Sequence, residues 1–252
     1  MARILDLLIV AGIAALGVRI YTSGLHSRYR AFFCYLIFAT VRSGIVANLN
    51  TAGKAYYRFW LVSEPIEWFF YVLVVLELYS LVLEDYRGLA TAGRWSLIAA
   101  ISLALAASGL SLLAPSHYTG QGIVMTYYYV AERAVYFSLL VFLLTILGVL
   151  MQYPITLSRN LIVHSVVFSV YFLANTAIYA MLSLFGPGII PAVTGVLNVV
   201  TLGSLCTWLL LLNPGGELRK QRLRPTWMPG REEALVGQLN SLNAALLRAT
   251  RK

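Results

Sequence analysis

Charged side chains are scarce in this 252-residue chain, making up only 12% of it, and lysine and histidine occur three times each. No lysine lies between residues 190 and 213, the last long apolar run, so this run cannot form the Schiff base that holds retinal. The three histidines lie on separate segments, whereas haem and zinc sites need several ligands close together. We therefore expect neither a rhodopsin-type pigment nor a haem or zinc protein.

The sequence also lacks the short motifs that mark common catalytic sites. It contains no HExxH, no GxSxG and no phosphate-binding glycine loop. Both cysteines, Cys34 and Cys206, lie inside apolar runs, where buried thiols usually serve packing and not a disulfide framework. The sequence predicts no enzyme activity, no cofactor and no metal site.

Long apolar runs dominate the chain, which is 60% hydrophobic and has a mean hydropathy of +0.77. A helix needs roughly 20 apolar residues to cross a membrane. Seven runs reach this length, at approximately 3–21, 31–49, 56–83, 95–114, 124–152, 161–185 and 190–213. The predicted fold is all-α, with a seven-helix membrane domain over 1–213 and a basic tail over 214–252.

Basic residues near the ends of these runs predict the orientation, because cytoplasmic loops carry the excess of Lys and Arg. The segments after the first, third and fifth runs and the tail are rich in arginine, whereas the opposite loops hold only Lys54 and Arg58. We therefore expect a multi-pass protein of the cell (inner) membrane, with its N-terminus outside and its C-terminus in the cytoplasm. The net charge of +9 largely reflects this asymmetry, and no basic folded domain is left for a nucleic-acid partner.

Spacing between polar positions suggests an internal repeat. Glu64, Glu132 and Asn198 lie 68 and 66 residues apart, each in a run that starts on the outer side. This pattern predicts one helix followed by three helical hairpins in parallel register.

The same three residues predict a polar layer inside the membrane. Each falls about eight residues into its helix, which is about 12 Å at 1.5 Å per residue. Arg42 and Asn175 lie at a similar depth on helices that run the other way, and Glu67 and Arg133 join them. Ionisable groups at this depth cost about 2.5 kcal/mol or more each, so they must be paired or face a wet cavity. Whether Glu132 or its neighbour Arg133 faces the interior is left open.

Pro65 stands between Glu64 and Glu67 and should leave the carbonyl of Leu61 without its helical partner. Free backbone groups at membrane depth must be buried in protein or line a cavity. The segment 63–67 is therefore either a cavity wall, or a kink whose acids are satisfied by Arg42 and Arg133.

Aromatic residues gather at the outer ends of the third and fifth runs. Most fit an interfacial belt, while Trp60 and Tyr128 could line the mouth of a pocket. At the inner ends, Glu77 is expected to pair with Arg19 or Arg30, and His164 to be interfacial or hydrogen-bonded and no ligand.

The tail carries a short amphipathic helix over about 231–249. Its seam contains Leu235, Leu239, Leu242 and Leu246, spaced as in a coiled coil but over about two heptads only. The helix could dock on a cytoplasmic partner, form a homodimer or lie on the inner leaflet.

The stretch YYRFWLVSEPIEWFFYVLVVLELYSLVLEDYRGLATAGR, residues 56–94, resembles part of a family of small bacterial seven-helix membrane proteins with no assigned activity. In plan, the chain resembles the seven-helix sensor modules of bacterial signalling proteins, which continue into a kinase or cyclase domain. Here about 40 residues follow the last predicted span, and no functional residue carries over from either group.

Three functions fit these features. The first is a sensor or receptor-like protein that binds a small polar or amphiphilic ligand in an outward-facing pocket and signals through its tail helix. Its expected ligand-binding residues are Arg42, Glu64, Glu67, Glu132, Arg133, Asn175, Asn198, Trp60 and Tyr128, with Pro65 as a structural kink. The second is a secondary transporter or proton-coupled carrier, and the third is a structural subunit of a membrane complex.

Overall fold

The computed structural model describes residues 2–49, 53–84, 95, 98–99, 102, 123–152, 157–185, 187–218, 220–221 and 231–249. Most of the fourth predicted span, 95–114, lies outside these described residues, as do the loop residues 85–94.

The described chain is almost entirely helical. Its elements are α1 Ala2–Thr22, η1 Leu25–Ser27, α2 Arg30–Asn48, α3 Lys54–Val82, α5 Ile123–Gln152, β1 Leu157–Ser158, α6 Arg159–Phe185, η2 Pro187–Ile189, α7 Ile190–Leu211, α8 Pro214–Leu218, β2 Lys220–Gln221 and α9 Arg231–Ala249. Each of the six predicted spans that falls on described residues has a helix whose ends lie within two residues of the expected ones.

Five described helices are long and apolar enough to cross a membrane: α2, α3, α6, α7 and the Val130–Gly148 part of α5. The apolar run Leu7–Thr22 of α1 is shorter. The outward sides of these helices are apolar too, with Phe69, Val199 and Leu210 all largely exposed. An apolar exterior around an apolar core is what a lipid environment requires, so the chain is a membrane protein.

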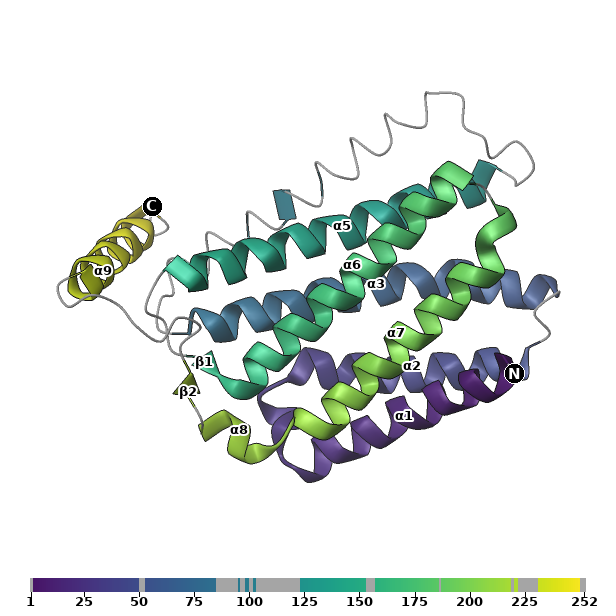
Figure 1. The fold of residues 1–252 in the computed structure, drawn as a ribbon, viewed down its shortest axis with the longest axis horizontal. Helices are drawn as coiled ribbons and strands as arrows, with labels where there is room; N and C mark the ends of the chain where they lie inside the picture. Colours follow the sequence, from purple (N-terminus) through teal and green to yellow (C-terminus); the bar gives the residue numbers. More distant parts are fainter. Residues whose placement is uncertain are drawn as a thin grey trace.

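The described long helices pack as a closed ring. Successive helices α1, α2, α3, α5, α6 and α7 contact one another, α7 returns to α1, and α3 also touches α6 across the ring (Figure 1). Leu16, Phe32, Val74, Leu139 and Phe172, each from a different helix, are buried where they meet. Side chains from α2, α3, α5 and α6 can therefore converge at one level.

One end of the ring, which we call the basic end, holds α8 and the start of α6 (Figure 1). Arg159 is the first residue of α6, and Arg28 lies beside Glu217 of α8. Helix termini there are capped by side chains from other helices. The Arg19 Nη2 donates to the Leu212 carbonyl, beyond the last turn of α7, over 2.9 Å. The Glu77 carboxylate of α3 accepts the backbone N–H groups of Ala31 and Phe32 at 2.8 and 3.2 Å.

Among the described residues Glu77 forms no salt bridge with Arg19 or Arg30, the two expected partners, although the positive charge of Arg30 does act on it. Glu77 instead satisfies the first N–H groups of α2, which have no partner within their own helix and carry the positive end of its dipole. Arg30 Nε donates to the Ser27 carbonyl instead.

The helix α9 covers the range over which the tail helix was expected. On its seam, Leu239 is buried and Leu246 half-buried, while the side chains of Leu235 and Leu242 lie outside the described part.

Candidate functional site

A buried ion pair joins α2 to α3 at the end of the ring opposite the basic end. The Arg42 guanidinium forms salt bridges with both Glu64 and Glu67, and its Nε donates to the Ser63 hydroxyl over 3.1 Å. The two glutamates are only 6% and 8% exposed. One arginine thus satisfies both acids of α3, which favours the kink interpretation of the segment 63–67 over an open cavity wall.

Pro65 lies inside α3 without ending it, and the Leu61 carbonyl is indeed left for another partner. That partner is the Tyr128 hydroxyl of α5, which donates to it. The Tyr128 ring packs against Trp60 and Trp68, with centroid distances of 5.2 and 5.6 Å. The carbonyl left free by Pro65 therefore joins α3 to α5 through the hydrogen bond from Tyr128.

Glu132 of α5 completes what we call the polar cluster: Arg42, Ser63, Glu64, Glu67 and Glu132. Its side chain is 2% exposed and lies within hydrogen-bonding reach of Tyr179 and Glu64. Its Oε2 atom is buried and has no hydrogen-bond partner among the described residues. Of the two adjacent residues, Glu132 is therefore the one that faces the interior. Arg133 is half-buried and has interactions of its own.

Tyrosines extend the polar cluster towards the middle of the ring. Tyr71 donates to Glu67 over 2.7 Å, and its hydroxyl also lies 3.0 Å from that of Tyr171 and 3.2 Å from that of Tyr35. Sequence reasoning missed them, although Tyr71 stands four residues after Glu67 and therefore on the same helix face. The same four-residue step leads from Glu132 to Tyr136.

The two predicted asparagines differ in their placement. Asn175 is buried, and its amide donates to the carbonyl of Tyr171 in its own helix. Asn198 is half-buried on α7, and among the described residues no hydrogen bond or ion pair joins it to the polar cluster. The structure therefore brings Arg42, Glu64, Glu67 and Glu132 together, with Tyr128 and Trp60 beside them, and leaves Asn198 apart.

A second network lies at the basic end and was not anticipated. Glu217 of α8 accepts hydrogen bonds from the Tyr29 hydroxyl at 2.6 Å and from the Asn160 amide at 2.8 Å, and Arg28 Nε lies 3.4 Å from its other oxygen. We call Arg28, Tyr29, Asn160 and Glu217 the tail network. Burial and the hydrogen bond to Glu217 raise the pKa of Tyr29, so its hydroxyl keeps the proton that it donates.

The chain after α7 folds back onto the ring at this network. Asn160 donates to the Asn213 carbonyl over 2.8 Å, and Gly216 N donates to the Asn213 side chain over 2.7 Å. Strand β2 then pairs antiparallel with β1, placing Ser158 opposite Lys220. Two connections, α8 and the strand pair, therefore tie the start of the tail to the start of α6.

Gly216 offers a direct test of this close packing. A Cβ built on Gly216 would fall inside the space of the Asn160 carboxamide, whereas one on Gly215 would meet only the Asn213 oxygen at 3.4 Å. We expect Gly216→Ala to cost about 1–2 kcal/mol of unfolding free energy in detergent, as overpacking does. The matched control Gly215→Ala should cost about 0.5 kcal/mol or less. Equal effects of the two would contradict the described packing of α8 on α6.

His164 occupies a different environment from the one expected. It is completely buried, with neither ring nitrogen hydrogen-bonded among the described residues, so it is not interfacial. Tyr29 and Phe32 lie 4.6 and 4.7 Å from its ring centroid, and Trp208 lies 6.0 Å away. No signal in the sequence predicted this aromatic surround, because its members come from α2 with its N-terminal cap and from α7, both distant from His164 in the chain.

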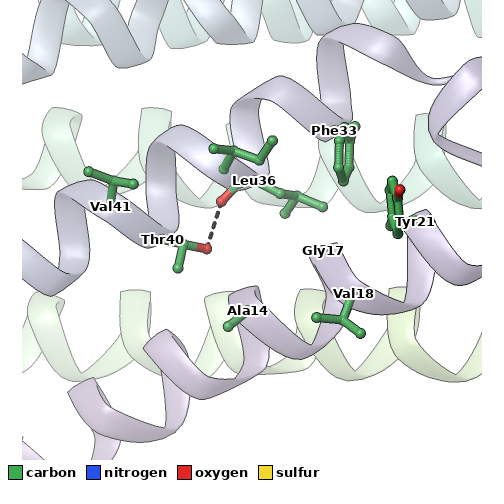
Figure 2. A pocket seen from close by; sticks show the side chains of 9 residues that line it. Ala14, Gly17, Val18, Tyr21, Phe33, Leu36, Thr40 and Val41 are labelled. Carbon is green, nitrogen blue, oxygen red and sulfur yellow. Dashed lines mark hydrogen bonds between the residues drawn. The ribbon is translucent and has the colours of Figure 1, made fainter.

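The groove in Figure 2 lies between α1 and α2, and no residue of the polar cluster lines it. Its volume is about 370 Å³, and Val18 and Tyr21 of α1 face Phe33 and Val41 of α2 across it. The Thr40 hydroxyl in its wall is already bonded to the Leu36 carbonyl. No predicted ligand-binding residue lines this groove, and its walls are apolar.

Among the described residues, no group of three or more His, Cys, Asp or Glu side chains is arranged to hold a metal ion. In comparisons with known proteins, no family model, no curated protein and no solved structure matches the chain. The resemblances stated from the sequence therefore stay predictions, and the function must be argued from the geometry.

Proposed function

We propose that this chain is a seven-helix membrane sensor, with its N-terminus outside, its C-terminus in the cytoplasm of the cell, and its ligand site at the polar cluster. Binding at the cluster is passed to the tail, where α9 meets a cytoplasmic partner or a second copy. The observation that carries the proposal is the dual role of α6. Its Tyr179 reaches Glu132 of the polar cluster, and its Tyr171 hydroxyl lies 3.0 Å from that of Tyr71, which donates to Glu67. Its Asn160 belongs to the tail network.

Unsatisfied polar atoms support the choice of ligand site. Buried atoms without a hydrogen-bond partner among the described residues include Trp68 Nε1, Glu132 Oε2 and Thr176 Oγ1. Trp68 follows Glu64 by one helical turn and Thr176 precedes Tyr179 by one turn, and both Glu64 and Tyr179 reach Glu132. Buried polar groups are normally satisfied, so the unpartnered Glu132 oxygen, with two further unpartnered groups within one turn of residues that reach Glu132, favours a bound molecule there.

The aromatic packing of α6 supports the coupling to the tail. From Asn160 the buried face continues through His164, Phe168 and Phe172, each four residues apart. Phe172 packs edge-on against Tyr71, which donates to Glu67 of the polar cluster, with ring centroids 5.6 Å apart. His164 packs against Tyr29 of the tail network with ring centroids 4.6 Å apart. A 27-residue helix is about 40 Å long and rigid, so a small shift at one end is carried to the other.

A melting experiment tests the ligand site. The detergent-purified protein is melted against a library of metabolites and lipids at several pH values between 5 and 8. A ligand at about 100 times its dissociation constant adds roughly 2.7 kcal/mol to the folded state. We expect a specific shift that is lost in Glu132→Gln and kept in Glu84→Gln, whose carboxylate is exposed at the basic end. A flat response from a protein that melts cooperatively would contradict the sensor proposal.

A second candidate is a proton-coupled carrier, favoured by the unpaired oxygen of Glu132 among three acids. Carriers place such ionisable groups on the path of their ions. Substrate-dependent uptake into proteoliposomes that Glu132→Gln abolishes would favour the carrier, whereas binding without uptake would favour the sensor.

A further inference from the structure

The charge of the polar cluster indicates the class of its ligand, an inference that rests on the proposed function. Glu64, Glu67 and Glu132 face the single guanidinium of Arg42, and even with half-buried Arg133 counted the acids outnumber the bases three to two. An uncompensated charge at membrane depth is strongly disfavoured. At least one positive charge is therefore missing from the site.

An anionic ligand does not fit this arrangement. Arg42, the one cation shown in contact with the acids, is already engaged by both glutamates of α3 and by the Ser63 hydroxyl. A carboxylate or phosphate would have to displace Glu64 or Glu67 and would add a further negative charge.

A proton shared between Glu64 and Glu132 is the competing way to balance the charge, since these two carboxylates lie within hydrogen-bonding reach of each other. Glu132 Oε2, however, has no hydrogen-bond donor among the described residues. An ammonium group supplies both the charge and an N–H donor for that oxygen.

The walls beside Glu132 also suit a cation. Tyr136, one turn further along α5, stacks on Tyr179 with centroids 5.9 Å apart and planes 9° apart. One turn before Glu132, the Tyr128 ring lies against Trp60 and Trp68. Aromatic faces attract cations electrostatically, so the carboxylate stands between two aromatic groups that favour positive charge.

We propose that the polar cluster binds a small primary or secondary amine in its ammonium form, with Glu132 as its counter-ion. The Trp68 indole and the Thr176 hydroxyl are buried without a hydrogen-bond partner among the described residues, each within one turn of a residue that reaches Glu132, and we expect them to meet a hydroxyl or carbonyl on the same molecule.

Matched probes of equal chain length test the ligand class: n-propylammonium, 1-propanol and propionate, with ethanolamine to add a hydroxyl and tetramethylammonium to remove the N–H donors. Each is titrated into the detergent-purified full-length chain at fixed pH and ionic strength, and the melting temperature is recorded. We expect a saturable rise with n-propylammonium, a larger one with ethanolamine, and none with propanol or propionate. Glu132→Gln should weaken the apparent affinity at least tenfold, while Glu84→Gln should leave it unchanged.

The outcomes separate the two proposals. A saturable shift with propionate but not with the amines would overturn the amine and leave a ligand site in place. An equal response to tetramethylammonium would overturn the N–H contact with Glu132. If amines do not shift the wild type and Glu132→Gln melts at least as high as the wild type, a neutral side chain at this position suffices and the amine proposal is wrong. A variant that does not fold is replaced by Glu132→Asp, in which the retracted carboxylate must weaken amine affinity.

Discussion

Replacement of Arg42 by glutamine is expected to lower the unfolding free energy by about 3–5 kcal/mol, because it leaves two carboxylates buried without a counter-ion. Glu64 and Glu67 are both buried, and Arg42 is their only salt-bridge partner among the described residues. Unfolding of the purified protein in mixed detergent micelles measures the loss.

Two control variants test whether the loss in Arg42→Gln comes from the unpaired buried charges. The triple variant Arg42→Gln, Glu64→Gln, Glu67→Gln removes the charges together and should recover a large part of the loss, since buried ion pairs add little over neutral groups. Glu84→Gln breaks an exposed salt bridge with Arg28 and should cost about 0–1 kcal/mol. If Arg42→Gln cost no more than Glu84→Gln, the buried pairing would be wrong.

Replacement of Glu217 by alanine is the second large effect that we expect, at about 3 kcal/mol. It removes the acceptor of two buried donors, the Tyr29 hydroxyl and the Asn160 amide, and hydrogen bonds to a charged group contribute about 1.5–3 kcal/mol each. Glu217→Gln keeps a carbonyl acceptor and should cost clearly less.

A double-mutant cycle with Tyr29→Phe isolates one of these bonds. Residues in one hydrogen-bond network show interaction energies of about 0.5–3 kcal/mol, so the two substitutions should not be additive. Strict additivity of Glu217→Ala and Tyr29→Phe would show that α8 is not held to α2 through this contact.

The sequence was most informative where one physical rule decides the outcome. Apolar runs predict the helices because their length is set by the membrane, and the ends agree within two residues on the described part. Pro65 predicts the free Leu61 carbonyl because proline has no N–H to offer it. The shared depth of Arg42, Glu64 and Glu132 follows from the rise per residue of a helix.

The contact partner of a given side chain or carbonyl could not be predicted in this way, because it depends on how the helices pack. Glu77 had two arginines within reach in the sequence, and the structure gives it two backbone N–H groups instead. The partner of the Leu61 carbonyl depends on how α5 packs against α3, and the surround of His164 depends on three helices. The short helix α8 was not predicted, because the sequence Asn-Pro-Gly-Gly at its start is typical of a turn.

In the proposed function the polar cluster binds a ligand, and α6 carries the effect of binding to the tail network. Amide hydrogen exchange over residues 212–221 measures this coupling, with and without the compound that gives the largest melting shift, in the wild type and in Glu132→Gln. We expect slower exchange in this segment when the compound binds the wild type, and no change in the variant. A compound that shifts the melting temperature through Glu132 but leaves exchange over residues 212–221 unaltered would contradict this coupling.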